Sequence, residues 1–286
     1  MALDPSTGNS ILPATLESAA LHPKYLGLYH SEHEIMALRH SSLRHFKLPA
    51  IGQNPVADDN AIATPLMLCL CDILAGGEKA NSWQLHLQGA VAIMKQISGR
   101  EHNRRNLQES HTRKFLRPWC ESLEVLSLLG PNSKLTGQAV DNSSSDYVDE
   151  FHGFSRTLIP LFQEANLLLM ERESLQEALE IGSQGHKIAE KMSYTVQERC
   201  RAAISQVKSS LARMSYTFHP SIESHISTRS RSDFISLNHA FHYGILLHLY
   251  RRVQYLPYTH PNIEASVQAI IRFYQAYIFE MKHVQG

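Results

Sequence analysis

The sequence predicts an all-α protein, folded as a single large multi-helix domain with short loops. Apolar residues recur at steps of three and four, the period of one helix face, as in the stripe Trp83, Leu87, Ala90, Met94 and Ile97. No alternating strand pattern of useful length occurs, and no repeat with a period of about 20 to 50 residues. With 286 residues, 43% apolar and 19% charged, the chain can bury a substantial core.

The helical domain is expected to occupy residues 31–284, after an irregular N-terminal segment at residues 1–30. The predicted helices span residues 31–48, 61–75, 81–99, 106–129, 148–171, 174–192, 195–214, 234–256 and 263–281. Between them we expect a loop at residues 51–60, a polar linker at 131–146 and a Ser/Arg loop at 215–233, because turn-forming and polar residues gather there.

Individual residues support several of these helix boundaries. Asn81 is a suitable N-cap with Gln84 three residues later, as in a capping box. Gly89 lies in the middle of that helix, where glycine is unfavourable, and the close approach of another helix would explain it. Pro118 is expected to start or kink a helix, and Pro160 to start or interrupt one.

Charge and cysteine use indicate an intracellular protein that is not built to grip DNA. Lys plus Arg and Asp plus Glu number 27 each, whereas a DNA-binding domain usually carries a basic excess. No secretory signal is evident, and no apolar run reaches the roughly 18 residues of a membrane span. The four cysteines are expected to be buried, reduced thiols, and none belongs to a C-x-x-C pair: Cys69, Cys71, Cys120 and Cys200.

No catalytic, cofactor-binding or metal-binding residue is predicted. His239 and His242 lie three residues apart near His248, but a metal site needs further ligands, so we favour polar or core histidines over a metal site. His86 borders the stripe that begins at Trp83. We interpret it as a hydrogen-bonded, partly buried histidine that fixes helix packing, with ligand sensing as the alternative.

Other polar and glycine motifs are also interpreted structurally. Asp58 and Asp59 precede a helix, where carboxylates favour the positive end of the dipole, and they lack the spacing of a metal–diphosphate motif. Gly76-Gly77 terminates a helix and does not form a phosphate loop. No G-x-S-x-G elbow is present.

Two groups of basic residues have a structural and a functional interpretation. The Ser227–Ser232 run is expected to be a solvated loop, with phosphorylation beside Arg229 and Arg231 as the alternative. The pairs Arg104-Arg105 and Arg251-Arg252 are interpreted as surface charge or interhelical pairing groups rather than as phosphate contacts.

Three segments carry motifs in a recognisable order. Residues 64–99 contain an apolar helix, a glycine stop and a W-x-x-H-x-x-G helix. Residues 149–162, DEFHGFSRTLIPLF, introduce a helix after a Gly and a Ser. The third motif, within residues 239–257, comprises Ala240, Leu247, His248, Leu249, Arg251, Arg252, Val253, Leu256 and Pro257. Together these motifs resemble the fungus-specific regulatory domain that usually follows a Zn₂Cys₆ DNA-binding cluster, over about residues 32–284.

The resemblance implies an all-helical regulator of a metabolic or secondary-metabolite pathway, acting in the nucleus, with additional cytoplasmic localisation left open. Because the zinc cluster needs six cysteines and this chain has four scattered ones, we expect no direct DNA binding. The N-terminal part is also shorter than is usual in the family. The expected partners are other transcription factors or a second copy, with a small-molecule effector as another mode of control and no membrane.

The exposed sides of the helices that begin near Phe234 and Ile263 are the candidate partner surfaces. The alternatives are a helical enzyme or carrier of secondary metabolism, and an inactive truncated regulator. The absence of recognisable acid/base, metal and phosphate motifs favours the regulator and predicts that the chain is not an enzyme.

Overall fold

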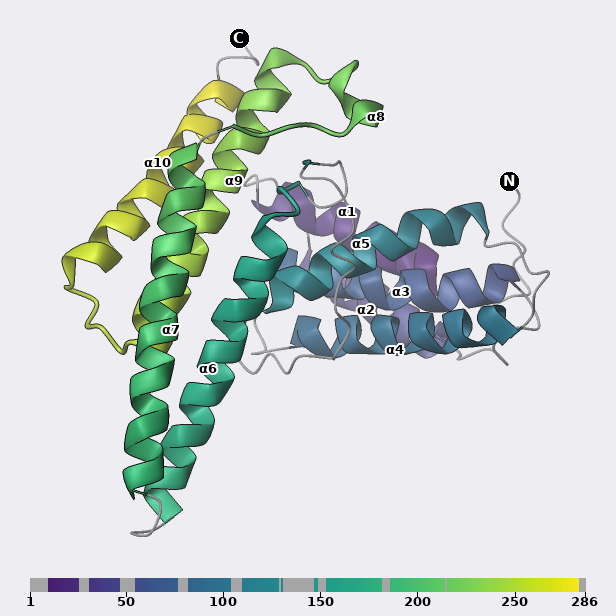
Figure 1. The fold of residues 1–286 in the computed structure, drawn as a ribbon. Helices are drawn as coiled ribbons and strands as arrows, with labels where there is room; N and C mark the ends of the chain where they lie inside the picture. Colours follow the sequence, from purple (N-terminus) through teal and green to yellow (C-terminus); the bar gives the residue numbers. More distant parts are fainter. Residues whose placement is uncertain are drawn as a thin grey trace. The chain divides into compact units, whose positions relative to one another are not determined.

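All regular elements that the computed structural model describes are helices, which confirms the predicted all-α class (Figure 1). The structure describes residues 10–25, 31–46, 55–76, 82–103, 110–128, 130, 147–148, 153–181, 186–213 and 215–282. Within them, no helix is long and apolar enough to cross a membrane. The helices group into two compact units, residues Met1–Glu124 and Val125–Gly286, and each is described by itself.

Unit 1 contains α1 (Ile11–Tyr25), α2 (Glu32–His45), α3 (Pro55–Leu74), α4 (Ser82–Asn103) and most of α5 (His111–Ser127). Helices α3 and α4 pack along each other, and α1 packs against both α2 and α3. The predicted stripe of α4 is confirmed: Leu87, Ala90, Met94 and Ile97 are buried in the core, with Trp83 packed against them.

The N-terminal segment was predicted to be irregular, and that prediction was wrong, because residues 11–25 form α1. Pro13 stands in the first turn, where the missing backbone N–H would have no partner in any case. Ala14 and Leu21 are buried at 0% and 3% exposure, so tertiary packing stabilises a helix that has only a weak sequence signal.

The start of α3 and two internal residues also differ from expectation. Helix α3 begins at Pro55, so most of the predicted loop at 51–60 is helical. Helix α5 continues through Pro118, because Leu116 and Cys120 on either side are buried in the core. Gly89 is exposed, and a Cβ there would meet no atom within 4 Å, so no close helix approach explains it.

Unit 2 contains α6 (Leu158–Ile181), α7 (His186–Arg213), the short α8 (Pro220–Glu223), α9 (Thr228–His248), the π-helical turn η2 (Leu249–Val253) and α10 (Pro261–Lys282). Helices α6 and α7 form a long hairpin, α9 packs against both, and α10 packs against α9 (Figure 1). At the centre, the rings of Phe154, Phe162 and Phe241 meet edge to face at 5.3 to 5.9 Å between centroids.

Three predicted helices over residues 148–214 are two in the structure, α6 and α7. Helix α6 has Pro160 in its first turn, as expected of a proline that starts a helix. Val148, predicted to open a helix, instead forms isolated bridges with Ser155 and Phe218. The predicted linker at residues 131–146 lies outside the described residues.

Candidate functional site

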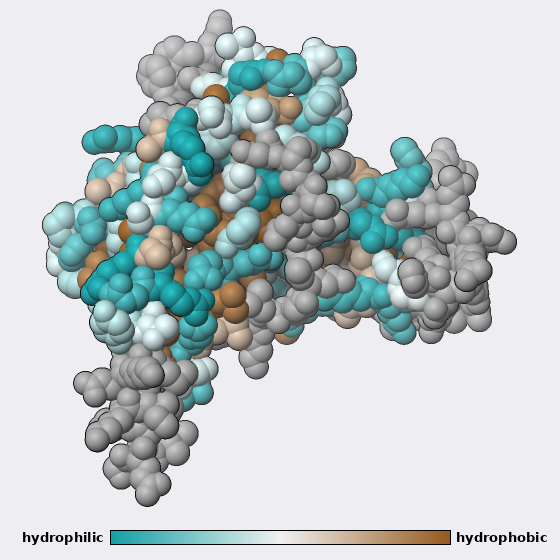
Figure 2. Space-filling view, viewed as in Figure 1, coloured by the Kyte–Doolittle hydropathy of each residue, from teal (hydrophilic) through white to brown (hydrophobic). Residues whose placement is uncertain are grey.

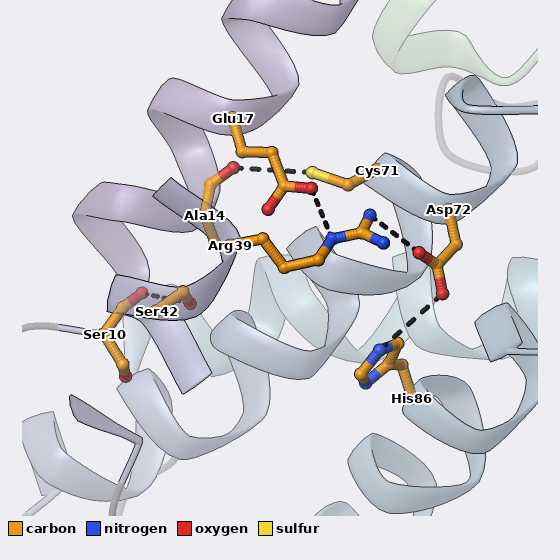
Figure 3. Close-up of polar contacts among 8 residues, drawn as sticks. All are labelled: Ser10, Ala14, Glu17, Arg39, Ser42, Cys71, Asp72 and His86. Carbon is orange, nitrogen blue, oxygen red and sulfur yellow. Dashed lines mark hydrogen bonds and ion pairs between the residues drawn. The ribbon is translucent and has the colours of Figure 1, made fainter. Parts of the chain in front are cut away.

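A buried charge network joins the first four helices of unit 1 (Figure 3). Arg39 of α2 lies between two carboxylates. Its Nε donates a hydrogen bond to Glu17 Oε1 of α1 at 2.7 Å, and its Nη2 lies 2.7 Å from Asp72 Oδ1 of α3. On the other side of Asp72, His86 Nε2 of α4 lies 3.6 Å from Oδ2. One guanidinium and one imidazole thus connect α1, α2, α3 and α4.

The spacing of buried residues in α2 places Arg39 on the helix face that contacts this site. Ile35 and Ser42, which lie four residues before and three residues after Arg39, are both buried, so the three share one helix face. The Ser42 hydroxyl donates to the Ser10 carbonyl at 2.7 Å, and the Ser10 and Thr64 hydroxyls lie 2.9 Å apart. These contacts fix α1 against α2 and α3 beside the network.

In this network the two acidic side chains are more deeply buried than the two basic ones. The Glu17 and Asp72 side chains are 0% and 3% exposed, whereas Arg39 and His86 retain 27% and 28%. Burial raises the pKa of Glu17, an effect that the neighbouring Arg39 guanidinium opposes. The arrangement can therefore hold helices together and accept a proton.

His86 lies where the sequence places it, at the border of the α4 stripe. Burial lowers the pKa of its ring, although the nearby Asp72 carboxylate works in the other direction. Its partial burial agrees with the predicted packing histidine, but the predicted hydrogen bond is not made to Asp72, because Oδ2 has no hydrogen-bond partner among the described residues. Ligand sensing by His86 stays a prediction.

The sequence reasoning missed Glu17, Arg39 and Asp72. One signal was available, since Asp72 is the single charged residue in the apolar run from Thr64 to Ala75. A carboxylate at such a position is rarely buried without a partner. The other two residues gave no signal, because Glu17 lies in the segment expected to be irregular and Arg39 is an ordinary polar residue of α2.

The histidines of α9 do not form a cluster of metal ligands. His242 Nδ1 lies 2.7 Å from the Asn238 carbonyl and Nε2 lies 3.1 Å from the Ser210 hydroxyl of α7. His239 stacks at a tilt on Phe273. His248 is 6% exposed, and burial, followed by the Arg252 charge, lowers its pKa to about 4. Among the described residues, no group of three or more suitable side chains could hold a metal ion.

All four cysteines are buried free thiols, as predicted. Burial raises the pKa of Cys69, Cys71 and Cys120 to about 12 and that of Cys200 to about 11, so each stays a neutral thiol. Cys69 belongs to the α3–α4 core, whereas Cys71 packs with Leu21 and Ile35, which confirms that the two point to different faces.

Asp58 and Asp59 were predicted to precede a helix, but both are buried residues within α3, with Asp58 in its first turn. Asp59 accepts hydrogen bonds from Arg113 Nε and Nη2 of α5 at 3.0 and 2.7 Å, and from the Ser110 hydroxyl at 2.6 Å. The reason is the extra helical turn from Pro55, which carries Asp59 into the interface with α5. Gly76 has a φ of 73° just after α3, as expected of a helix stop, while Gly77 lies outside the described residues.

Asn238 of α9, directly before the third motif of the sequence, bonds to the second motif. Its side-chain oxygen accepts from the Ser155 backbone N–H at 2.6 Å, and its amide nitrogen donates to the carbonyls of Gly153 at 3.3 Å and Phe234 at 2.7 Å. Gly153 has a φ of 66°, and a Cβ there would lie 3.3 Å from the Leu237 side chain. This close approach explains why the H-G-F-S motif carries a glycine.

The Ser/Arg run is helical rather than a loop, because Ser227 caps α9 by accepting from the Ser230 backbone N–H at 3.0 Å. Within the run, Arg231 pairs with Glu223 and stacks over the Phe218 ring. Phosphorylation of the Ser227–Ser232 run, the alternative interpretation, stays a prediction.

The Arg251-Arg252 pair has partners inside unit 2, as the pairing interpretation predicts. The Arg251 guanidinium lies over the Tyr258 ring, and Arg252 donates to the Gly130 carbonyl at 3.0 Å. The Arg104-Arg105 pair lies outside the described residues.

Comparison with known proteins identifies a family for this chain. Residues 7–278 match the profile of a family described as the fungal specific transcription factor domain. No curated protein and no solved structure shows a significant match.

Proposed function

Because this chain belongs to the family of the fungal specific transcription factor domain, we propose that it regulates a fungal metabolic or secondary-metabolite pathway through protein partners or a sensed small molecule. The observation that carries this proposal is the family match, which spans residues 7–278 and supports a role in transcription regulation. Nuclear action follows from that role. The family is regulatory, which favours a regulator over a helical enzyme or carrier of secondary metabolism.

Control through partners accounts for the composition of the chain. Its four cysteines cannot supply the six of a zinc cluster, and its formal charge is zero, so little favours contacts to DNA phosphates. A regulator of this kind acts on genes through a DNA-bound factor. In a mobility-shift experiment with a promoter whose transcript depends on the chain, we expect no specific shift from the chain alone. A sequence-specific shift by the purified chain would overturn this mode of action.

An apolar face of α10 is the candidate surface for a partner. Val267 and Ile271, four residues apart on one face, are each 38% exposed, whereas Ile263 at the start of the helix is buried. On α9, Leu237 is exposed while Ile245 belongs to the core, as does Leu249 at the start of η2. The coloured residues in Figure 2 form hydrophilic areas with smaller hydrophobic ones between them. Neighbouring exposed apolar residues such as Val267 and Ile271 are candidate contacts for another apolar face.

A tethering experiment tests this surface. The full chain is fused to an unrelated DNA-binding module, and the output of a reporter gene is measured in a fungal host. We expect a change in reporter output that is lost in the double variant Val267→Asp, Ile271→Asp and kept in the control Gln268→Asp, which alters an exposed residue of the same helix. Equal output from the double variant and the control would exclude this face as the docking site.

A further inference from the structure

Glu17 is a carboxyl group held away from solvent, and Arg39 is its one cationic neighbour among the residues that the structure describes. Its side chain is 0% exposed, and Arg39 Nε donates to Oε1 at 2.7 Å. Among the described residues, no hydrogen-bond partner reaches Oε2, which is also buried. An ionised carboxylate with a bare oxygen in such surroundings costs far more free energy than a neutral, protonated carboxyl does.

The charges around Glu17 do not balance. Helix α2 contributes Arg39 and helix α3 contributes Asp72 and the Cys71 thiol, which donates to the Ala14 carbonyl at 3.5 Å. Asp72 takes the other side of the same guanidinium at 2.7 Å, so two carboxylates share one Arg39 (Figure 3). The Cys71 thiol is neutral. With both carboxylates ionised, the group carries one uncompensated negative charge, since a single arginine can offset only one of them.

We propose that unit 1 binds a proton at Glu17 when it folds, and that loss of this proton at higher pH weakens the attachment of α1 to α2 and α3. The ligand of this site is the proton itself, and the moving element is α1. Glu17 and the Ala14 carbonyl of α1, together with the carbonyl and hydroxyl of Ser10 just before it, bond to the neighbouring helices. A charge placed at the centre of that set disfavours the docked helix.

The direction of the pH effect follows from linkage. Burial raises the pKa of Glu17 in the folded unit, so the folded state holds the proton more tightly than the unfolded chain. Between the unfolded value of about 4.3 and the raised folded value, the free energy of unfolding therefore falls as pH rises. His86 has the opposite sign, because its lowered pKa makes unit 1 less stable as pH falls below about 6.5.

Tryptophan emission isolates unit 1 in the full chain, because the two tryptophans, Trp83 and Trp119, both belong to it. Denaturant unfolding of the wild type and of Glu17→Gln is followed by this emission from about pH 4.5 to 8. The ratio of the two unfolding constants removes the His86 contribution common to both proteins. We expect the wild type to become relatively less stable as pH rises, by about tenfold for each unit that separates the two pKa values of Glu17.

The matched control is Glu34→Gln, which neutralises an exposed carboxylate of α2 and should give a ratio independent of pH. A ratio for Glu17→Gln that is equally flat would overturn the proposal. If Glu17→Gln does not fold, carbon-13 NMR of the wild type replaces it, read at the side-chain carboxyl of Glu17. If this carboxyl titrates at a higher pH than the exposed glutamates, the proposal is supported. If it titrates at the same pH as they do, the proposal is refuted.

Discussion

At the scale of single residues, Asp59 and Arg113 form a buried ion pair in unit 1. Both side chains are under 10% exposed, and Arg113 donates twice to one carboxylate oxygen. Removing one member of such a pair leaves an uncompensated buried charge. We expect Arg113→Ala to lower the free energy of unfolding by about 3 to 5 kcal/mol, measured by tryptophan emission in denaturant. Lys114→Ala, at the next and exposed position, is the control, and a similar loss in both variants would contradict this role.

His248 makes unit 2 sensitive to acid. Its folded pKa of about 4 lies below the ordinary value of 6.5, so the unfolded chain binds its proton first and stability falls as pH drops from 6.5 towards 4. This pKa shift corresponds to a loss of about 3 kcal/mol in the free energy of unfolding once His248 is fully protonated. We expect His248→Leu to remove most of that loss, measured by hydrogen exchange of the α9 amides at pH 6.5 and 4.5. The exposed control His225→Leu should retain the loss, and an unchanged acid response of His248→Leu would disprove the assignment.

The buried charge network shows why single residues were hard to predict. Each of its members looks ordinary in its own helix, and the pairing of Glu17 with Arg39 joins positions 22 residues apart, with Asp72 a further 33 along the chain. Helical periodicity reports contacts within one turn and says nothing about such pairs. Only Asp72, a single charged residue within an apolar run, indicated from the sequence that a charge would be buried.

At the scale of elements, Asn238 attaches the Gly153–Ser155 segment to α9 through two hydrogen bonds, and its third bonds the Phe234 carbonyl within α9. An alanine there leaves the Ser155 N–H without its partner, at a cost of about 1 to 3 kcal/mol. We therefore expect Asn238→Ala to speed hydrogen exchange in residues 153–157 while the α6–α7 hairpin stays protected. Asn262→Ala, at an exposed position in the first turn of α10, should have no such effect. Unchanged exchange at residues 153–157 would show that other contacts hold this segment.

Helices with one strong apolar stripe were predictable, and those held by distant contacts were not. The α4 stripe is the clear success, because its spacing is helical and every member packs in one core. Helix α1 was missed because its order depends on α2 and α3. The start of α9 was missed because a Ser/Arg run resembles a loop, although Ser227 is a favourable N-cap for the helix that follows.

At the scale of the whole molecule, the buried charge network and the exposed face of α10 belong to different units. The proton-binding network lies in unit 1, while the exposed face of α10 proposed for a partner lies in unit 2. The two proposals can therefore fail independently. A Glu17→Gln stability ratio that does not depend on pH would not affect the regulatory role, and unchanged reporter output from the α10 double variant would not affect the proton site.

Transcript profiling after deletion of the gene in its native host tests the regulatory role most directly. The membership of residues 7–278 in the fungal specific transcription factor domain family predicts altered transcripts for the genes of one metabolic or secondary-metabolite pathway. Restoring the full chain should restore those transcripts. Unchanged transcripts together with loss of one metabolic conversion would contradict the regulatory role and favour a helical enzyme instead.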